Sequence, residues 1–348
     1  MTTRKKQGNN TGRTGGRNGG KQRNRRPGTP AKKNIRGNNT KNTRRGTATR
    51  SAIRRPKPKA RRNTLRRWWK RAGWCKRILA TAGTALAAVC AVALAWGTTS
   101  FVVQRIAFVT AEERQQDLGD RYGFDPGNII SDGQFFNGYA MSRAEVQSFL
   151  DEHGGDCTGT GCLKNRTFDT TDQPDDRYCD GYDGAKGETA ATIIDKSSRS
   201  CGISQKVLLT VLQKEQQLIT ASKPTDFQFK AAMGLSCPDD NDCDPQYAGF
   251  FRQVYGAAHR YRYYVRHEAS YGYHVGKLNF VRFHPNTSCG GANVVIGNKA
   301  TALLYIYTPY QPNEAALAAG AGEGDSCSSY GNRNFSIIYR GWFADARH

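Results

Sequence analysis

Apolar residues recur with helical spacing in "LLTVLQKEQQLIT", which covers residues 208–220. At about 100° per residue, the aliphatic side chains gather on one side of the predicted helix, and Glu215 falls at the centre of that side. Lys214, Gln216 and Gln217 point away from it. The pattern therefore predicts a helix whose buried face contains a carboxylate. The apolar stripe consists of Val207, Leu208, Val211, Leu212, Leu218 and Ile219.

Five further segments have the periodicity of helices. "MSRAEVQSFL" places Ser142 and Glu145 at the spacing of a capping box, in which each side chain bonds to a backbone amide of the first turn. "ETAATIIDKSSRSCG" is predicted to be a helix that ends before Gly202, and "QYAGFFRQVYGAAHRYRYYVRH" has a second apolar stripe. Helices are also predicted at 298–307 and 334–345.

Two segments between these helices favour other structure. "YGYHVGKLNFVRFHPN" alternates apolar and polar residues, which predicts a short β-hairpin with its turn near Gly276. "SKPTDFQFKAAMGLSCPDDNDCDP" breaks the helical period and is predicted to be irregular. We therefore expect an α+β fold that is mainly α, in one exterior domain of residues 127–348.

An uncharged run extends from Ile78 to Val103. As an α-helix, residues 78–97 would span about 30 Å, close to the hydrocarbon thickness of a bilayer, which predicts a transmembrane helix. Basic residues and tryptophans precede this helix and no comparable basic cluster follows, so the positive-inside rule places the N-terminus in the cytoplasm. The alternative is a secreted protein, cleaved from a signal peptide near Ala95. The long basic segment in front favours an uncleaved anchor.

Charge separates the N-terminal tail from the rest. Residues 1–77 hold 28 of the 52 Lys and Arg residues and none of the 29 Asp and Glu residues, so the remaining chain has a formal charge of −5. The composition of 1–66 predicts a disordered cytoplasmic tail. It could act only in topology and solubility, contact anionic lipid, or bind nucleic acid, which is least favoured because no base-reading module accompanies it. We assign 67–103 to the juxtamembrane and transmembrane segment and 104–126 to a linker.

Eight cysteines lie in the exterior part. An even number in an exported segment predicts disulfide bonds, and we expect each cysteine to pair with its neighbour along the chain. Zinc is the alternative, which the absence of closely spaced Cys-x-x-Cys pairs disfavours. No metal or cofactor is expected. The predicted pairs are Cys157 with Cys162, Cys179 with Cys201, Cys237 with Cys243, and Cys289 with Cys327.

Glu215 is the strongest candidate for chemistry. A carboxylate buried among aliphatic side chains without a partner is costly, and remaining protonated removes that cost. A neutral carboxylic acid near pH 7 is what protonation of a glycosidic oxygen requires. The alternative is a glutamate at the edge of the stripe, bonded to a loop amide or to a lysine.

Longer motifs connect the chain with known families. "VLLTVLQKEQ" followed by "AAMGL" resembles the helix-ending catalytic Glu and the Gly-Ala-Met-Gly-Leu loop of soluble lytic transglycosylases and goose-type lysozymes. Most of 125–345 also resembles an exported envelope-protein family of actinobacteria with a lysozyme-like domain. The motifs of this second resemblance are "GNIIS" (127–131), "LQKEQ" (212–216), "HPNTSCG" (284–290), "YTPYQPN" (307–313) and "GDSCSSYGNRNF" (324–335).

The resemblance implies a lysozyme-like domain that cleaves the MurNAc–GlcNAc bond of peptidoglycan glycan strands, with Glu215 as general acid and then base. A non-catalytic glycan-binding or scaffold domain that kept the fold is the alternative. Lytic transglycosylases have Ser directly after the Glu, where this chain has Gln216, and their Ala-Tyr-Asn-Ala-Gly segment with its orienting tyrosine is absent. The implied substrate-binding residues are Gln216, Met233, Gly234, Tyr307 and Tyr310.

The mechanism depends on a second carboxylate. A lytic transglycosylase needs only one acid/base because the substrate's own 6-hydroxyl attacks, whereas an inverting lysozyme needs an Asp to activate water. The run "PDDNDCD" could equally be a calcium loop, although it lacks the twelve-residue pattern and the terminal Glu. The nearest candidates in sequence are Asp226, Asp239, Asp240, Asp242 and Asp244.

Overall fold

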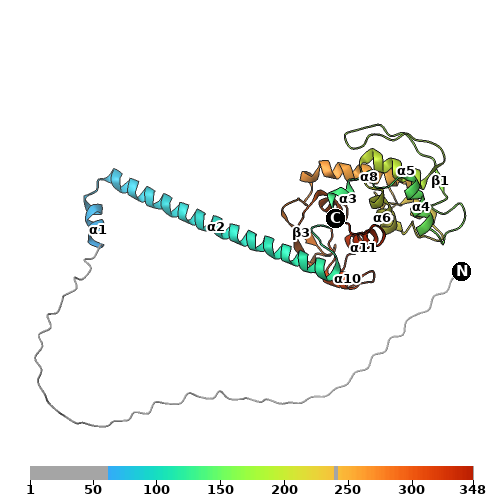
Figure 1. Ribbon diagram of the computed structural model, residues 1–348. Helices are drawn as coiled ribbons and strands as arrows, with labels where there is room; N and C mark the ends of the chain where they lie inside the picture. The colour runs from blue at the N-terminus through green and yellow to red at the C-terminus, as the bar shows by residue number, and fades with distance from the viewer. Residues whose placement is uncertain (1–61, 239–241, 348) are drawn as a thin grey trace, which may run out of the picture. The chain divides into compact units, whose positions relative to one another are not determined.

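The computed structural model describes residues 62–238 and 242–347 (Figure 1). The predicted disorder of residues 1–61 falls outside these ranges, and so do two acidic residues of the candidate calcium loop, Asp239 and Asp240. The chain divides into two compact units, with the boundary directly after Gly73.

The first unit contains helix α1 (Arg62–Arg71). Residues 62–66, which the sequence analysis assigned to the tail, are therefore helical. The sequence "RNTLRRWWKR" has no Gly or Pro, and its arginines, leucine and lysine are good helix formers. The composition that predicts disorder therefore ends a few residues earlier than expected.

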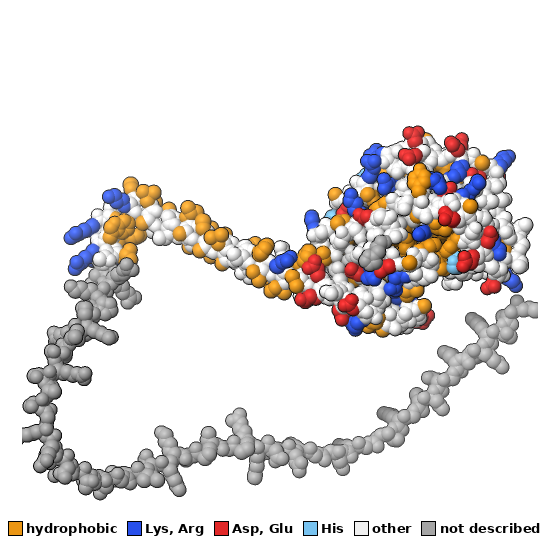
Figure 2. Space-filling model, in the orientation of Figure 1, with side chains coloured by type: hydrophobic (Ala, Val, Ile, Leu, Met, Phe, Trp, Pro, Cys, Tyr) orange, Lys and Arg blue, Asp and Glu red, His pale blue; other side chains and the backbone are white. Residues whose placement is uncertain are grey.

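The second unit begins with α2 (Trp74–Tyr122), a helix of 49 residues. It is long and apolar enough to cross a membrane, and it contains the predicted span 78–97. Its apolar side chains are exposed along this part of the helix, as the orange atoms of Figure 2 show. Exposed aliphatic side chains in an uncharged run of this length are typical of a helix that faces lipid.

The predicted linker, 104–126, is mostly helix, because α2 continues through Tyr122. Ala111, Gln115 and Leu118 are its buried residues, and their spacing of four and three places them on one face. The Gln115 side chain accepts a hydrogen bond from the Val295 amide at 2.7 Å and donates one to the Val295 carbonyl at 3.2 Å. The end of α2 is therefore docked on the domain formed by residues 127–348.

Residues 127–348 form a domain that is mainly helical, as predicted, and that contains two small antiparallel sheets. Helices α5 and α8 pack on each other, α4 and α6 pack on α5, and α11 packs on α6 (Figure 1). The helices are α3 (Asp132–Phe135), α4 (Arg143–His153), α5 (Ala190–Cys201), α6 (Gln205–Gln216), α7 (Asp226–Lys230), α8 (Phe250–Arg266), α9 (Lys299–Tyr307), α10 (Glu314–Ala318) and α11 (Gly331–Phe343), with 3-10 turns η1 (Glu268–Ser270) and η2 (Thr287–Cys289). The strands are β1 (Thr167–Phe168), β2 (Glu188–Thr189), β3 (Leu278–Arg282) and β4 (Gly291–Val295).

The predicted helix signals are present in the structure. Ser142 and Glu145 form the capping box at the start of α4, and Gly202 ends α5 in the left-handed conformation, with φ of 60°. Helix α6 ends at Gln216, earlier than the stripe suggested, because Gln217 is also left-handed, with φ of 50°. The last two stripe residues are buried beyond the helix rather than on it. The segment predicted to be irregular contains helix α7, so the prediction was wrong for these residues. A capping box starts this helix.

The predicted hairpin is displaced along the chain. Strand β3 pairs with β4 through residues 283–290, whereas Gly276 lies before β3. The buried Asn279 side chain explains the shift, since it bonds to the amide and carbonyl of His274 and to the carbonyl of Lys277 and so holds this segment in a loop. Alternation alone could not distinguish a strand from this side-chain-bonded loop.

All four predicted disulfide bonds are present. Two of them, Cys157–Cys162 and Cys237–Cys243, join cysteines that are five and six positions apart in the sequence. Cys179–Cys201 joins the loop before β2 to the end of α5, and Cys289–Cys327 joins η2 to the segment before α11. The irregular parts of the domain are therefore tied covalently to its helices and its hairpin.

We expect Gln115→Ala to lower the free energy of unfolding of the domain of residues 127–348 by about 1–2 kcal/mol, because it leaves the Val295 amide without its hydrogen bond. Denaturant unfolding of the full chain in detergent, followed by circular dichroism, measures this loss. Gln116→Ala is the matched control, since Gln116 is exposed on the same turn. An equal effect of both substitutions would show that Gln115 does not dock the helix.

Candidate functional site

Glu215 lies in the last turn of α6, and its side chain is 25% exposed. One carboxylate oxygen, Oε1, is 2.6 Å from Nζ of Lys214, whose side chain is only 9% exposed. The carboxylate is therefore half-buried and has a charged partner. This is the lysine-bonded arrangement that the sequence left open as the alternative to an unpaired buried acid.

The Met233–Gly234 loop lies against Glu215. A Cβ atom added at Gly234 would be 3.2 Å from the Glu215 carboxyl carbon and from one of its oxygens, and Gly234 has a φ of +69°. Both the space and the backbone conformation therefore favour glycine at this position. The structure thus brings together the helix-ending glutamate and the loop that the resemblance connects with it.

Tyr307, the last residue of α9, contacts the same loop. Its hydroxyl donates a hydrogen bond to the Met233 carbonyl, and its ring is 5.7 Å from Lys214 Nζ. Burial, and then the neighbouring Tyr261 and Glu215, raise the pKa of the Tyr307 hydroxyl well above its ordinary value. The hydroxyl therefore stays protonated near neutral pH and remains a hydrogen-bond donor that fixes the loop.

Tyr261 of α8 completes this group, with its ring 5.3 Å from that of Tyr307 in an edge-to-face arrangement. The residue is fully buried, and its hydroxyl has no hydrogen-bond partner among the described residues. A buried, unpaired hydroxyl costs about 1–3 kcal/mol, so such groups are rare in proteins and are often functional. Burial, and then the Glu215 charge, raise the pKa of Tyr261 as well.

Two of the predicted substrate-binding residues have different surroundings. Gln216 accepts a hydrogen bond from the Gln228 side chain at its backbone carbonyl. Tyr310 forms a β-bridge with Arg282, and its carbonyl accepts a hydrogen bond from Asn332. The contacts described for these two residues do not include Glu215, the Met233–Gly234 loop or Tyr307.

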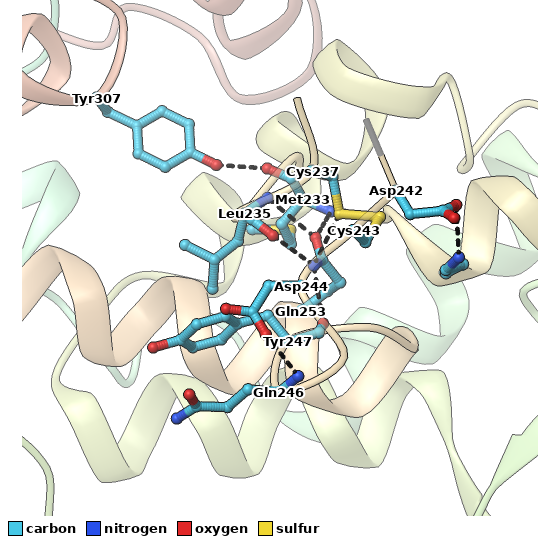
Figure 3. The surroundings of a disulfide bond; sticks show 11 residues. Met233, Leu235, Cys237, Asp242, Cys243, Asp244, Gln246, Tyr247, Gln253 and Tyr307 are labelled. Carbon is cyan, nitrogen blue, oxygen red and sulfur yellow. Dashed lines mark hydrogen bonds and ion pairs between the residues drawn. A yellow bond between two sulfur atoms is a disulfide. The ribbon is translucent and has the colours of Figure 1, made fainter. Parts of the chain in front are cut away.

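Gln253 of α8 is a residue of this site that the sequence analysis missed. Its side-chain oxygen accepts hydrogen bonds from the amides of Met233 and Leu235, both at 3.0 Å. Its nitrogen donates to the carbonyls of Leu235 and Tyr247, both at 2.8 Å. Figure 3 shows the Gln253 side chain between the loop and Tyr247. The fully buried amide therefore fixes the loop that faces Glu215.

The aspartates that the sequence offered as a second carboxylate bond to groups other than Glu215. Asp226 pairs with Arg166 and Asp242 pairs with Lys230, each at 3.3 Å, and both aspartate side chains are more than 90% exposed. The Asp244 carboxylate accepts a hydrogen bond from the Gln246 amide. Among the described residues, no cluster of three or more metal-binding side chains is present.

Residues 128–345 match the family described as LasA, N-terminal domain. The chain belongs to this family. The LasA N-terminal domain of this protein contains Glu215, the Met233–Gly234 loop, Tyr307 and all eight disulfide-bonded cysteines. No curated protein and no solved structure matches the chain. The family description names neither a lysozyme nor a lytic transglycosylase, so the expected lysozyme-like character of the LasA N-terminal domain stays a proposal.

We expect Tyr307→Phe to lower the free energy of unfolding by about 1–3 kcal/mol, because the buried Met233 carbonyl loses the donor that it has in this structure. Denaturant unfolding measures the change. Tyr310→Phe is the control, because it removes the same hydroxyl from a residue away from the loop, and it should change the stability by a few tenths of a kcal/mol at most. Equal losses would contradict the role of Tyr307.

Proposed function

We propose that the protein is a membrane-anchored envelope protein whose LasA N-terminal domain cleaves peptidoglycan glycan strands by the one-carboxylate mechanism of lytic transglycosylases. The observation that carries this proposal is the approach of Gly234 to the Glu215 carboxyl group. A helix-ending glutamate that faces a Met-Gly loop is the arrangement that the resemblance to those enzymes implies. A lysozyme-like fold is part of the same proposal.

In this mechanism the Glu215 carboxyl group acts twice. It first donates its proton to the glycosidic oxygen, and the C–O bond to the MurNAc anomeric carbon breaks. The carboxylate then accepts the proton of the MurNAc 6-hydroxyl while that oxygen bonds to the anomeric carbon, which gives a 1,6-anhydro product. Lys214, 2.6 Å away, would stabilise the carboxylate that the first step generates.

The surroundings of the aspartates support a mechanism with one carboxylate. An inverting enzyme needs a second carboxylate about 6.5–9.5 Å from the first, where it activates water. Asp226 and Asp242 are almost fully exposed, and each forms an ion pair with a basic residue. The 6-hydroxyl of the substrate supplies the nucleophile in our proposal, so no second carboxylate is required.

The anchor places this chemistry at the cell envelope. We propose that α2 spans the membrane, with the basic tail in the cytoplasm and the LasA N-terminal domain outside. The exposed apolar side chains of α2 and the disulfide bonds support this arrangement. In the cytoplasm, the basic residues of the tail would be attracted to anionic lipid.

A second candidate function is glycan binding without cleavage. The Lys214–Glu215 ion pair favours it, because the Lys214 ammonium group, 2.6 Å away, already bonds to the carboxylate oxygen Oε1 that a general acid would present to the glycosidic oxygen. In a binding domain, the same pair would offer one donor and one acceptor to sugar hydroxyl groups. The two candidates differ in whether glycan strands are shortened.

We expect Glu215→Gln to reduce the release of anhydro-muropeptides from purified cell walls by a factor of about 10²–10⁴, because an amide cannot donate the proton. Mass spectrometry of the released products measures both the rate and the product type. Glu152→Gln, which changes an exposed glutamate of α4, is the control and should leave the release unchanged.

Three results would decide between the candidates. Release that survives Glu215→Gln would refute the role of Glu215. Reducing-end products in place of anhydro products would replace the transglycosylase mechanism with hydrolysis. Binding to cell walls with no release by the wild-type chain would favour the glycan-binding function.

A further inference from the structure

A cavity of about 670 Å³ lies between α8 and the chain around residues 171–176. Its volume is in the range of small-molecule sites in proteins, which is about 300–1,000 Å³. Glu215 does not line it, and none of the predicted site residues does. The cavity is therefore separate from the candidate catalytic group. The kind of ligand that it could bind follows from the residues that line it.

Aromatic rings form one wall of the cavity. Tyr247, Phe251, Tyr255 and Tyr263 line it, and Phe251 and Tyr255 are mostly buried, so the wall is firmly held. The Tyr247 ring lies over Gly256, where an added Cβ would be 3.3 Å from that ring. Flat aromatic surfaces of this kind suit the apolar faces of sugars and the side chains of peptides.

The charged residues of the cavity leave an excess of positive charge. Asp176 is 2.8 Å from the His259 ring nitrogen. Partial burial opposes the ionisation of Asp176, but hydrogen bonds from His259 and from the Tyr178 and Cys179 amides outweigh it and lower the pKa of Asp176. The aspartate is therefore ionised near neutral pH and is already bonded, so it does not neutralise an arginine of the cavity.

Two arginines of α8 line the same cavity. Arg252 donates to the Pro245 carbonyl, and Arg260 donates to the Tyr247 hydroxyl, each at 3.0 Å. Neither guanidinium forms an ion pair with a carboxylate in the described part of the chain. A guanidinium has five N–H donors, so each arginine keeps donors for a carboxylate ligand.

The wall opposite α8 is tied in place. Cys179, three residues after Asp176, is bonded to Cys201 at the end of α5. The Asp176 amide donates to the Cys179 carbonyl, and Gln173 and Tyr182 form a β-bridge. The cavity is therefore formed before a ligand arrives, which lowers the entropic cost of binding.

We propose that this cavity binds the carboxylate-bearing stem peptide of peptidoglycan, with Arg252 and Arg260 on the carboxylate and the tyrosines on the peptide and its sugar. The inference rests on the proposed function, because it assigns the substrate of the same domain. Stem peptides carry free carboxylates, whereas the N-acetylglucosamine units of the strand offer none to two arginines.

The loop that faces Glu215 connects this cavity with the site. Leu235 follows Gly234 directly, and a Cβ added at Gly256, which lines the cavity, would be 2.8 Å from the Leu235 side chain. Gln253 bonds to Leu235 and also to the Tyr247 carbonyl. A peptide held in the cavity would therefore lie beside the loop that contacts the acid.

The test measures the binding of N-acetylmuramyl-L-alanyl-D-isoglutamine to the full chain in detergent micelles by calorimetry. The variants are Arg252→Gln, Arg260→Gln and their double substitution, and Arg260→Lys keeps the charge should Arg260→Gln not fold. Arg266→Gln is the matched control, because Arg266 is an exposed arginine of the same helix that does not line the cavity. The same compound with its carboxyl group amidated is the ligand control.

We expect the double substitution to weaken binding at least tenfold, and the amidated compound to bind the wild-type chain at least tenfold more weakly than the acid. Arg266→Gln should bind as the wild type does. Equal binding of acid and amide, or no binding of the acid, would overturn the inference. Arginine-dependent binding by a chain that releases no muropeptides would support the cavity and refute the proposed cleavage, so the two failures are distinguishable.

Discussion

The buried amide of Gln253 holds the centre of the LasA N-terminal domain together. One side chain of α8 satisfies two amides and a carbonyl of the loop at Met233–Leu235 and also the carbonyl of Tyr247. A loop inside a protein must pair its backbone groups, because each unpaired group costs as much as a lost hydrogen bond. The position of Gly234 against Glu215 and the position of Tyr247 over Gly256 both depend on this amide.

Helix α8 contributes side chains both to the group around Glu215 and to the cavity. The face of α8 with Tyr261 contacts the group around Glu215 and Tyr307, and the face with Tyr255 and His259 lines the cavity. Gln253 lies between these faces with all four of its hydrogen-bonding positions used. The helix therefore contributes side chains to both places, and Gln253 fixes the loop that lies between them.

The local part of this structure could be predicted from the sequence, because its signals depend on neighbouring residues. The capping box at Ser142, the end of α5 at Gly202 and the four disulfide pairs are of this kind. Glu215 was found as a polar residue within an apolar stripe. Gln253 is also a polar residue within an apolar stripe, since it is three residues from Phe250 and four from Ala257. The helical period could therefore have predicted its buried position as well.

What the sequence could not provide are contacts between distant segments. The bond from Gln115 to Val295 joins residues 180 positions apart, so the sequence indicated a linker where α2 is docked. Asn279 turned an alternating segment into a loop through bonds that only the folded chain forms. The partner of Glu215 was adjacent in sequence, but the helical period placed Lys214 on another face, and its long side chain reaches back to the carboxylate.

The continuity of α2 limits where the domain can work. From Val103, at the end of the uncharged run, to Ala111, the first of its buried residues, the helix rises by about 12 Å. With α2 in a bilayer, as proposed, neither a flexible hinge nor a long linker separates the membrane span from the domain. The domain can therefore reach only the material next to the membrane. The distance between the cell wall and the bilayer would then decide whether the domain can contact its substrate. A change in that distance would start or stop this contact without any change in the protein itself.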